Sequence, residues 1–303
     1  MADPARVLIT GASGLLGREL LAAFAATPDF AATGAAFSRA TGGLVKLDLR
    51  DDAAIAATVA ALRPRVVVHA AAERRPDVCE ADAAAAEALN VHAVYALARA
   101  AAAAGAFFVY ISTDYLFDGS AAPYAETAPL SPLNAYGEQK ARGEAAAAAG
   151  HPAPFVLRVP VLYGPTRDLR ESAVTAFAAV VRDGKPAAVD DWQIRVPTRT
   201  TDIAATVVNV ARAAVAGGGA PALAGVFHYS SKERVTRYGL VHLFGELLGL
   251  PTAHVARLEG APPGARRPYD CMLDTRKLDA TGLAAPHASF RDAVAEVLRG
   301  AAE

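Results

Sequence analysis

Near the N-terminus the chain reads Ala5-Arg-Val-Leu-Ile-Thr-Gly11-Ala-Ser-Gly14-Leu-Leu-Gly17. The apolar run predicts a buried strand, and the three glycines predict a tight turn into a helix. Gly11 permits the turn, Gly14 lets the backbone approach a pyrophosphate, and Gly17 lets the helix pack closely on the strand. A purely structural glycine turn is the alternative. The order of strand, turn and helix favours a dinucleotide whose phosphates meet the positive end of the helix.

The same alternation continues through the first half of the chain. Short apolar runs bounded by Gly, Pro or Asp occur at 30–37, 43–48, 64–70, 106–112 and 154–161. We interpret them as buried parallel strands. Crossover helices are predicted between them at 14–27, 51–62, 80–104 and 134–149. The predicted fold class is therefore α/β, with a Rossmann-type doubly wound parallel sheet.

The second half of the chain loses this rhythm. Proline-punctuated loops and a Gly-Gly-Gly run at 217–219 interrupt it after about residue 160. We predict that residues 1–160 form the dinucleotide-binding domain and that 196–229 return to its sheet. Residues 161–195 and 230–303 are predicted to form a smaller, irregular, substrate-binding C-terminal lobe.

Composition excludes several classes of protein. The 303 residues include 30 Lys+Arg against 31 Asp+Glu, and 53% are hydrophobic, which argues against nucleic-acid binding and disorder. The sequence has no apolar stretch of about 18 residues, so no membrane span is expected. Cys79 and Cys271 are far apart, and the first residues lack a secretory signal, so we expect a reducing, cytoplasmic location. The seven histidines lack ligand spacing, and no metal site is predicted.

The end of the second predicted strand distinguishes the two nicotinamide dinucleotides. A cofactor with a free ribose 2′-hydroxyl calls for Asp or Glu there, whereas this chain has Phe37-Ser38-Arg39. Arginine can pair with a 2′-phosphate, so NADP(H) is predicted. NAD(H) is the alternative if Arg39 is only a solvated loop residue. Asp48 and Leu49 follow the third predicted strand, where they can hold the adenine, unless Asp48 caps the next helix.

A proton-transfer set is predicted from the segment Tyr136-Gly-Glu-Gln-Lys140. It places a phenol and an ammonium on one face of a helix that Asn134 can cap. A nearby ammonium favours phenolate, so we expect the tyrosine pKa to fall toward working pH. This spacing is common by chance, but Thr113 ends the fifth predicted strand, at the sheet edge where ligands bind. Its hydroxyl can hydrogen-bond a carbonyl oxygen that the tyrosine protonates.

The glycine spacing, the Thr113, Tyr136 and Lys140 set and the segment Arg158-Val-Pro-Val-Leu-Tyr163-Gly164 resemble the extended short-chain dehydrogenase/reductase family. The resemblance covers nearly the whole chain. It implies that Tyr136 is the acid/base, that Thr113 is its partner at the carbonyl, and that Lys140 also binds the nicotinamide ribose.

Within that family, segments 112–119, 197–204 and 267–278 resemble the dTDP-4-dehydrorhamnose reductases. This resemblance implies NADP(H)-dependent reduction of a keto group on a nucleotide sugar. Nucleotide-sugar dehydratases of the wider family carry Asp-Glu after the threonine, for the elimination of water. This chain has Asp114-Tyr115 there, which argues against a dehydratase.

A competing resemblance involves segments 69–78, 171–175 and 191–195, which are similar to the regulatory β subunit of methionine adenosyltransferase II. That resemblance implies a non-catalytic, NADP-binding protein with the catalytic subunit of methionine adenosyltransferase as its partner. Because the β subunit keeps a hydroxyl, Tyr and Lys set, such a set cannot choose between the two functions. The chain lacks the aromatic and basic tail that engages the partner, so we expect the reductase.

The resemblance also implies a full set of contacts. The predicted cofactor site consists of Gly11, Ser13, Gly14, Leu15, Leu16, Gly17, Phe37, Ser38, Arg39, Asp48, Leu49, Ala70, Ala71, Ala72, Arg74, Tyr136, Lys140 and Leu162. Gln193, Arg195 and Arg267 are predicted to bind the diphosphate of the nucleotide-sugar substrate. A homodimer is compatible with the family.

Two features keep alternative interpretations. The charged run from Glu73 to Asp77 is either a salt-bridged helix start or a charged rim over the cofactor or the substrate diphosphate. Asn90, in the middle of a predicted helix, either holds backbone or water near Lys140 or is a satisfied buried amide.

Overall fold

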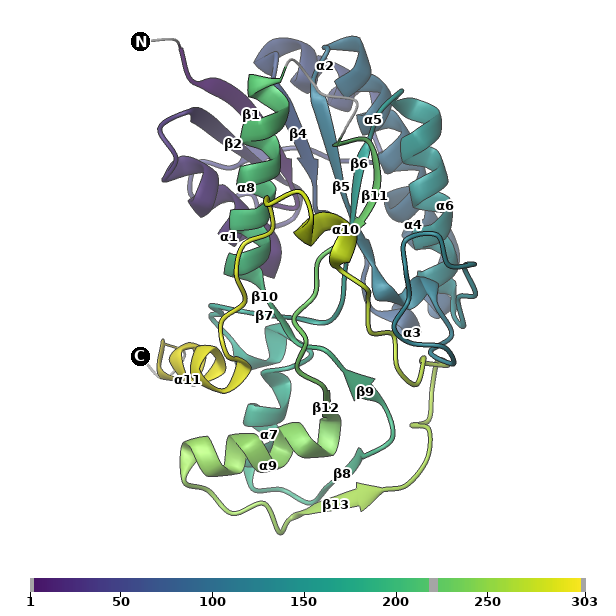
Figure 1. Cartoon of the computed structure of the whole chain (residues 1–303), viewed down its shortest axis with the longest axis vertical. Coiled ribbons are helices and arrows are strands. Elements are labelled where there is room, and N and C mark those ends of the chain that lie inside the picture. Colours follow the sequence, from purple (N-terminus) through teal and green to yellow (C-terminus); the bar gives the residue numbers. More distant parts are fainter. Residues whose placement is uncertain (1–2, 218–222, 301–303) are drawn as a thin grey trace.

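The computed structural model describes residues 3–217 and 223–300, and Figure 1 shows a sheet above and a smaller lobe below. The glycine run at 217–219 and the chain end at 301–303 therefore lie largely outside the described residues. Within the described ranges, no helix is long and apolar enough to cross a membrane.

One parallel sheet forms the upper part of the molecule. Its strands are β1 (Ala5–Thr10), β2 (Phe30–Ala36), β3 (Val45–Lys46), β4 (Val66–His69), β5 (Phe107–Thr113), β6 (Phe155–Val159) and β11 (Gly225–His228). They lie in the order β11-β6-β5-β4-β1-β2-β3. The strand order reverses between β1 and β4, so the doubly wound fold predicted from the sequence is confirmed.

Helices cover both faces of the sheet (Figure 1). One face carries α1 (Leu15–Ala25) and α8 (Thr200–Ala216), and the other carries α2 (Asp52–Leu62), α5 (Ala93–Ala103) and α6 (Ala135–Gly150). Successive residues of a strand face opposite sides, so Val7 and Leu8 of β1 belong to different cores. Strands buried on both faces read as continuous apolar runs, which is why the sequence reveals them.

Two predicted elements differ from the structure. The helix expected at 80–104 is interrupted once, at Asp82: α3 (Pro76–Ala81) ends there, and α4 (Ala83–Glu87), a π-helical turn (Ala88–His92) and α5 then follow one another without a gap. The break has a local cause, because the Asp82 side chain accepts a hydrogen bond from Ala85 N (3.1 Å) and starts a new helix. The strand expected at 43–48 is shorter than predicted: only β3, at Val45–Lys46, is extended, and it lies at the sheet edge, where it pairs with β2 alone.

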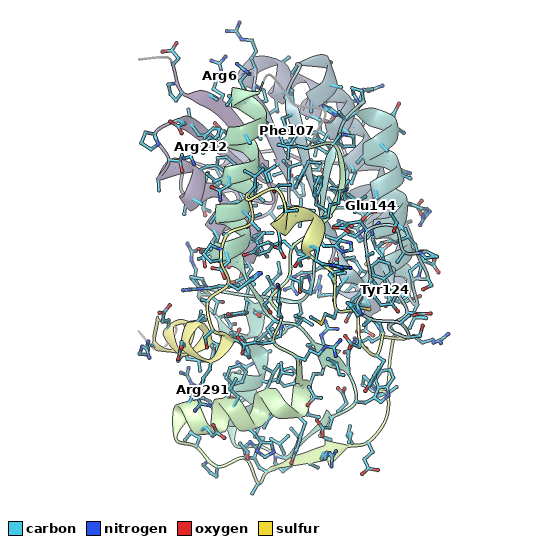
Figure 2. All side chains as sticks on the ribbon, in the orientation of Figure 1. Arg6, Phe107, Tyr124, Glu144, Arg212 and Arg291 are labelled. Carbon is cyan, nitrogen blue, oxygen red and sulfur yellow. The ribbon has the colours of Figure 1, made fainter. Side chains whose placement is uncertain are left out.

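The lower lobe contains short strand pairs and three longer helices. The pairs are β7 (Leu162–Tyr163) with β10 (Thr198–Arg199), β9 (Ile194–Arg195) with β12 (Val235–Thr236), and β8 (Ala187–Asp190) with β13 (Val255–Leu258). The helices are α7 (Ala176–Asp183), α9 (Arg237–Leu248) and α11 (Phe290–Gly300), while α10 (Arg276–Asp279) lies beside the sheet. They share a core that includes Val181, Phe244 and Val294. Arg291 of α11 pairs with Glu246 of α9 at 2.9 Å (Figure 2).

Candidate functional site

A pocket of about 820 Å³ lies at the carboxyl edge of the sheet. Its walls come from the loops after β1, β2, β4 and β5, from α6, and from the lower lobe. All of the predicted cofactor residues line it, from Gly11 in the first loop to Leu162 in β7. Thr113, Tyr136 and Lys140 line the same pocket, so the structure brings the two predicted sets together.

The glycine loop has the shape that its sequence requires. Gly11 has φ +71°, a left-handed conformation that favours glycine. A Cβ on Gly17 would lie 2.0 Å from Gly11 O, so only glycine lets α1 pack this closely on the loop. Gly14 precedes α1, and no side chain caps the helix there. The first-turn N–H groups therefore face the pocket, which fits a bound pyrophosphate.

The side chains after β2 and β3 form the far end of the pocket. Phe37 and Arg39 line it, and the Arg50 guanidinium stacks over the Phe37 ring at 5.1 Å. Both carboxylate oxygens of Asp48 accept hydrogen bonds from Arg50, at 2.9 and 2.7 Å. The alternative role of Asp48 as a helix cap is wrong, because Asp51 accepts the bond from Ala54 N at the start of α2.

The proton-transfer side chains converge from β5 and α6. Thr113 is the last residue of β5, while Tyr136 and Lys140 lie one turn apart near the start of α6. The Asn134 side chain caps this helix as predicted, accepting a hydrogen bond from Gly137 N at 3.0 Å. The Lys140 ammonium donates to Ile111 O at 2.7 Å and lies 4.0 Å from the centre of the Tyr110 ring.

The expected fall of the tyrosine pKa is wrong for this structure. Burial raises the pKa of the Tyr136 phenol above its ordinary value, and the neighbouring Thr113 hydroxyl opposes the rise only in part. Burial also lowers the pKa of Lys140 to about 7. The common cause is burial, which disfavours the charged form of each group, and for Lys140 the nearby Glu144 opposes the fall. The neutral phenol is the favoured form of Tyr136.

Asp114 lines the site but is not among the predicted site residues. It follows Thr113, lines the pocket and is only 6% exposed. The Thr113 hydroxyl donates to its Oδ1 at 3.2 Å. Burial raises its pKa to about 6, while the nearby Arg195 opposes the rise. Its position directly after the strand-ending threonine was the available signal.

The charged run after β4 matches both of the roles predicted for it. Glu73 pairs with Arg75 at 2.7 Å, and Asp77 pairs with Arg267 of the lower lobe at 2.6 Å, so the helix start is salt-bridged. The same side chains also line the pocket. Asn90 is a satisfied buried amide: it accepts from Glu73 N and donates to Glu73 O, both at 3.0 Å.

Only two of the three predicted substrate-binding residues line the pocket. Arg195 and Arg267 line the pocket, and the Arg195 guanidinium lies 5.1 Å from the centre of the Tyr115 ring. Gln193 does not line it, because this buried side chain turns away and donates to Pro268 O at 2.9 Å. Arg237 also lines the pocket and had no sequence signal, since it opens α9 far along the chain.

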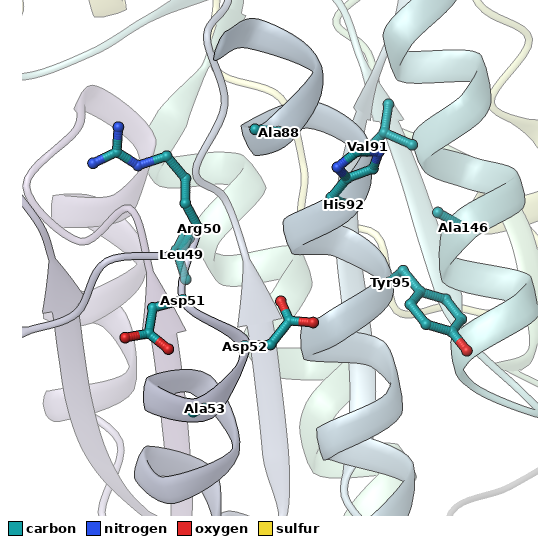
Figure 3. Close-up of a pocket in the computed structure, with 10 residues that line it drawn as sticks. All are labelled: Leu49, Arg50, Asp51, Asp52, Ala53, Ala88, Val91, His92, Tyr95 and Ala146. Carbon is teal, nitrogen blue, oxygen red and sulfur yellow. The ribbon is translucent and has the colours of Figure 1, made fainter. Parts of the chain in front are cut away.

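A second hollow of about 770 Å³ lies between the start of α2 and the π-helical turn before α5 (Figure 3). Asp51 and Asp52 lie on one side, with His92 and Tyr95 on the other. Over the part of the chain that the structure describes, no three His, Cys, Asp or Glu side chains are grouped to hold a metal ion.

The sequence profile of the RmlD substrate binding domain family matches residues 5–302. The chain belongs to this family. It is similar to methionine adenosyltransferase 2 subunit beta of Danio rerio, with 40% identity over 296 residues, 97% of this chain and 90% of the relative. It is also similar to dTDP-4-dehydrorhamnose reductase of Streptomyces griseus, with 36% identity over 283 residues, 92% of this chain and 88% of the relative.

Among solved structures, a dTDP-4-dehydrorhamnose reductase from Clostridium acetobutylicum is similar, with a TM-score of 0.81 and 26% identity over 97% of this chain and 98% of that chain. The predicted relationship to these reductases and to the β subunits is therefore confirmed. These two relatives carry the names of a subunit of one enzyme and of another enzyme. These names alone do not choose between the two functions.

Proposed function

We propose that this protein is an NADP(H)-dependent reductase of a keto group on a nucleotide sugar. The observation that carries the proposal is that three arginines of the lower lobe, suited to a sugar diphosphate, line the same pocket as the glycine loop and the Thr113, Tyr136 and Lys140 set. Membership of the RmlD family and the name of the Streptomyces griseus relative support it.

The residues divide the work between binding and proton transfer. The first turn of α1 and the backbone at 70–72 would hold the dinucleotide, which supplies the hydride when bound. Tyr136 would donate the proton of its phenol to the carbonyl oxygen. Thr113 donates a hydrogen bond to the same oxygen as negative charge develops there. Lys140 would orient the nicotinamide ribose, and burial keeps its pKa near 7.

Preference for NADP(H) over NAD(H) is part of the proposal. Ser38 and Arg39 follow β2 and line the pocket. At this position NAD(H) would need a carboxylate to bind its free ribose 2′-hydroxyl. Among the described residues, no carboxylate forms an ion pair with Arg39. Its guanidinium is therefore available to a 2′-phosphate.

The substrate would bind against the lower lobe. Arg195, Arg237 and Arg267 line this side of the pocket. Three guanidinium groups suit the diphosphate of a nucleotide sugar, because arginine can bind phosphate oxygens in a bidentate manner. Gln193 is not part of the proposed contact set, since its side chain faces away from the pocket.

Tyr136→Phe tests the proposal, with dTDP-4-dehydrorhamnose and NADPH as the reactants. The variant should lose sugar-dependent NADPH oxidation by about 10²-fold or more, because it lacks the proton donor. Its Kd for NADPH should stay within about twofold of the wild-type value, since the phenol oxygen is not needed to hold the phosphates. Tyr95→Phe, at an exposed position on α5, is the matched control. Undiminished turnover in Tyr136→Phe would show that another group supplies the proton.

A second function is favoured by a specific observation, the 40% identity to methionine adenosyltransferase 2 subunit beta. In that case the protein would bind NADP(H) and regulate a catalytic partner without turning over a sugar. Size-exclusion chromatography of the protein mixed with a methionine adenosyltransferase catalytic subunit separates the two functions. Co-elution without sugar-dependent NADPH oxidation would support the regulatory function and overturn the reductase.

A further inference from the structure

The segment 164–173 of the lower lobe lies against the first turn of α1, and Glu171 makes the contact. Arg18 donates from Nη1 to Glu171 Oε1 at 2.7 Å and from Nη2 to Oε2 at 2.8 Å. The two side chains are 22% and 17% exposed, so this bidentate pair is largely shielded from water. It joins the helix that carries the glycine loop to a segment from the opposite side of the pocket.

Further bonds centre on the same residue. Arg18 Nη1 also donates to Ser13 O at 3.1 Å, inside the glycine loop. Arg74, from the loop after β4, donates to the backbone oxygen of Glu171 at 2.6 Å. Thr166 donates to Glu171 Oε2 at 3.0 Å. Two separate loops of the proposed cofactor site are therefore tied to one residue of the lower lobe.

The position of the segment makes these bonds relevant to a ligand. Glu171, Ser172 and Ala173 line the same pocket as the glycine loop. Ser172 is itself anchored, because its hydroxyl donates to Leu162 O at 2.7 Å. A dinucleotide lying along the first turn of α1 would thus be covered on its lobe side by this segment.

We propose that Glu171 is a positioning residue of the cofactor site: by binding Arg18 and Arg74 it closes segment 164–173 over the glycine loop and slows release of the dinucleotide. This inference rests on the proposed function only in requiring that NADP(H) binds in the pocket. It does not require that the protein turns over a sugar.

The test is the rate of NADPH release, measured by stopped-flow fluorescence after mixing the complex with excess NADP⁺. Glu171→Gln should release NADPH about tenfold faster, the size expected when one charge-assisted hydrogen-bond pair is lost. Arg18→Gln should show the same acceleration. The double variant should add little to either, because both single changes break the same pair.

The neighbouring pair provides a matched control. Arg170 belongs to the same turn and pairs with Asp183 at 2.7 Å, but both side chains are well exposed and the pair lies within the lower lobe. Arg170→Gln should leave the release rate unchanged. Melting temperatures of all variants are recorded, and release is measured at a temperature at which every variant is folded. Hydrogen exchange of 164–173 in the ligand-free protein should rise in Glu171→Gln and stay unchanged in Arg170→Gln.

The outcomes are distinguishable. Wild-type release rates in Glu171→Gln, or equal acceleration in Arg170→Gln, would overturn the role of Glu171 while leaving the proposed function intact. Failure of the wild-type protein to bind NADPH or NADH would instead overturn the proposed function, and it is seen before any variant is made.

Discussion

Asp114 has a carboxyl group that is nearly removed from water at the wall of the main pocket. Burial raises its pKa from 3.8 to about 6, against the opposing effect of Arg195. Between about pH 4 and pH 6 the folded protein holds a proton that the unfolded chain has released. The free energy of unfolding therefore falls as pH rises through this window, and the whole loss is present above pH 6. Residues kept at such a cost often serve the site rather than the fold.

Asp114→Asn should accordingly stabilise the protein at pH 7.5, by up to about 3 kcal/mol from a shift of about two pKa units. The gain should shrink as the pH falls and approach zero below about pH 3, where the carboxyl is protonated in both the folded and the unfolded states. Thermal unfolding at a series of pH values measures this. Asp118→Asn is the control, because hydrogen bonds from Ser120 lower the pKa of that carboxyl and no gain is expected. An equal gain at pH 4 and pH 7.5 would contradict the argument.

Individual site residues were predictable where the signal is local. The glycine spacing, the Tyr136 and Lys140 pair and the threonine that ends β5 are each set within one short segment, and all reach the pocket. Glu171 and Arg237 reach it through the packing of the lower lobe, which no local pattern encodes. The pKa of Tyr136 was mispredicted for the same reason, because burial depends on the whole surroundings.

At the level of elements, α6 is held to the sheet by an internal ion pair. Arg158 of β6 donates from Nε and Nη2 to Glu144 at 2.8 and 2.7 Å, and the side chains are 4% and 10% exposed. Ser112 of β5 donates to the same carboxylate at 2.6 Å. Figure 2 labels Glu144, which belongs to the second half of α6. Because α6 carries Tyr136 and Lys140, this link fixes the helix that presents them to the pocket.

Glu144→Gln should lower the free energy of unfolding by about 3–5 kcal/mol, because it leaves the buried Arg158 charge without its partner. Urea unfolding measures the change. On the same helix, Arg142→Gln breaks an exposed pair with Glu87 and should cost less than about 1 kcal/mol. The double variant Glu144→Leu with Arg158→Met should be milder than Glu144→Gln alone, since no charge stays buried. A loss in Glu144→Gln no larger than in Arg142→Gln would contradict this role.

The strands and helices could be predicted from the periodicity of apolar residues, but the irregularities within a helix could not. The strands of the sheet follow from apolar runs that are buried on both faces. The helix expected at 80–104 widens into a π-helical turn around Asn90, whose side chain bonds Glu73 and Gln139. These partners lie in a loop and on another helix, so the π-helical turn involves tertiary contacts that helix propensity does not include.

For the molecule as a whole, charge is distributed unevenly. The formal net charge is only -1, yet the described residues that line the main pocket include eight Lys or Arg and six Asp or Glu. Arg39 is the cationic side chain next to the proposed 2′-phosphate position, after β2. A 2′-phosphate bound there would add negative charge to a ligand that is already anionic. Dissolved salt screens the attraction between that phosphate and Arg39.

Raising NaCl from 50 to 500 mM should therefore weaken binding of NADPH more steeply than binding of NADH, as measured by fluorescence titration of each. At low salt the wild type should prefer NADPH by about tenfold or more, the value of one charge-assisted contact. Arg39→Ala should remove most of that preference and make the two salt dependences alike, because the added phosphate then has no paired cation. Arg63→Ala, at the far end of α2, is the control and should change neither. If NADH bound as tightly as NADPH and with the same salt dependence in the wild type, Arg39 would be a solvated loop residue and NAD(H) would be the better cofactor assignment.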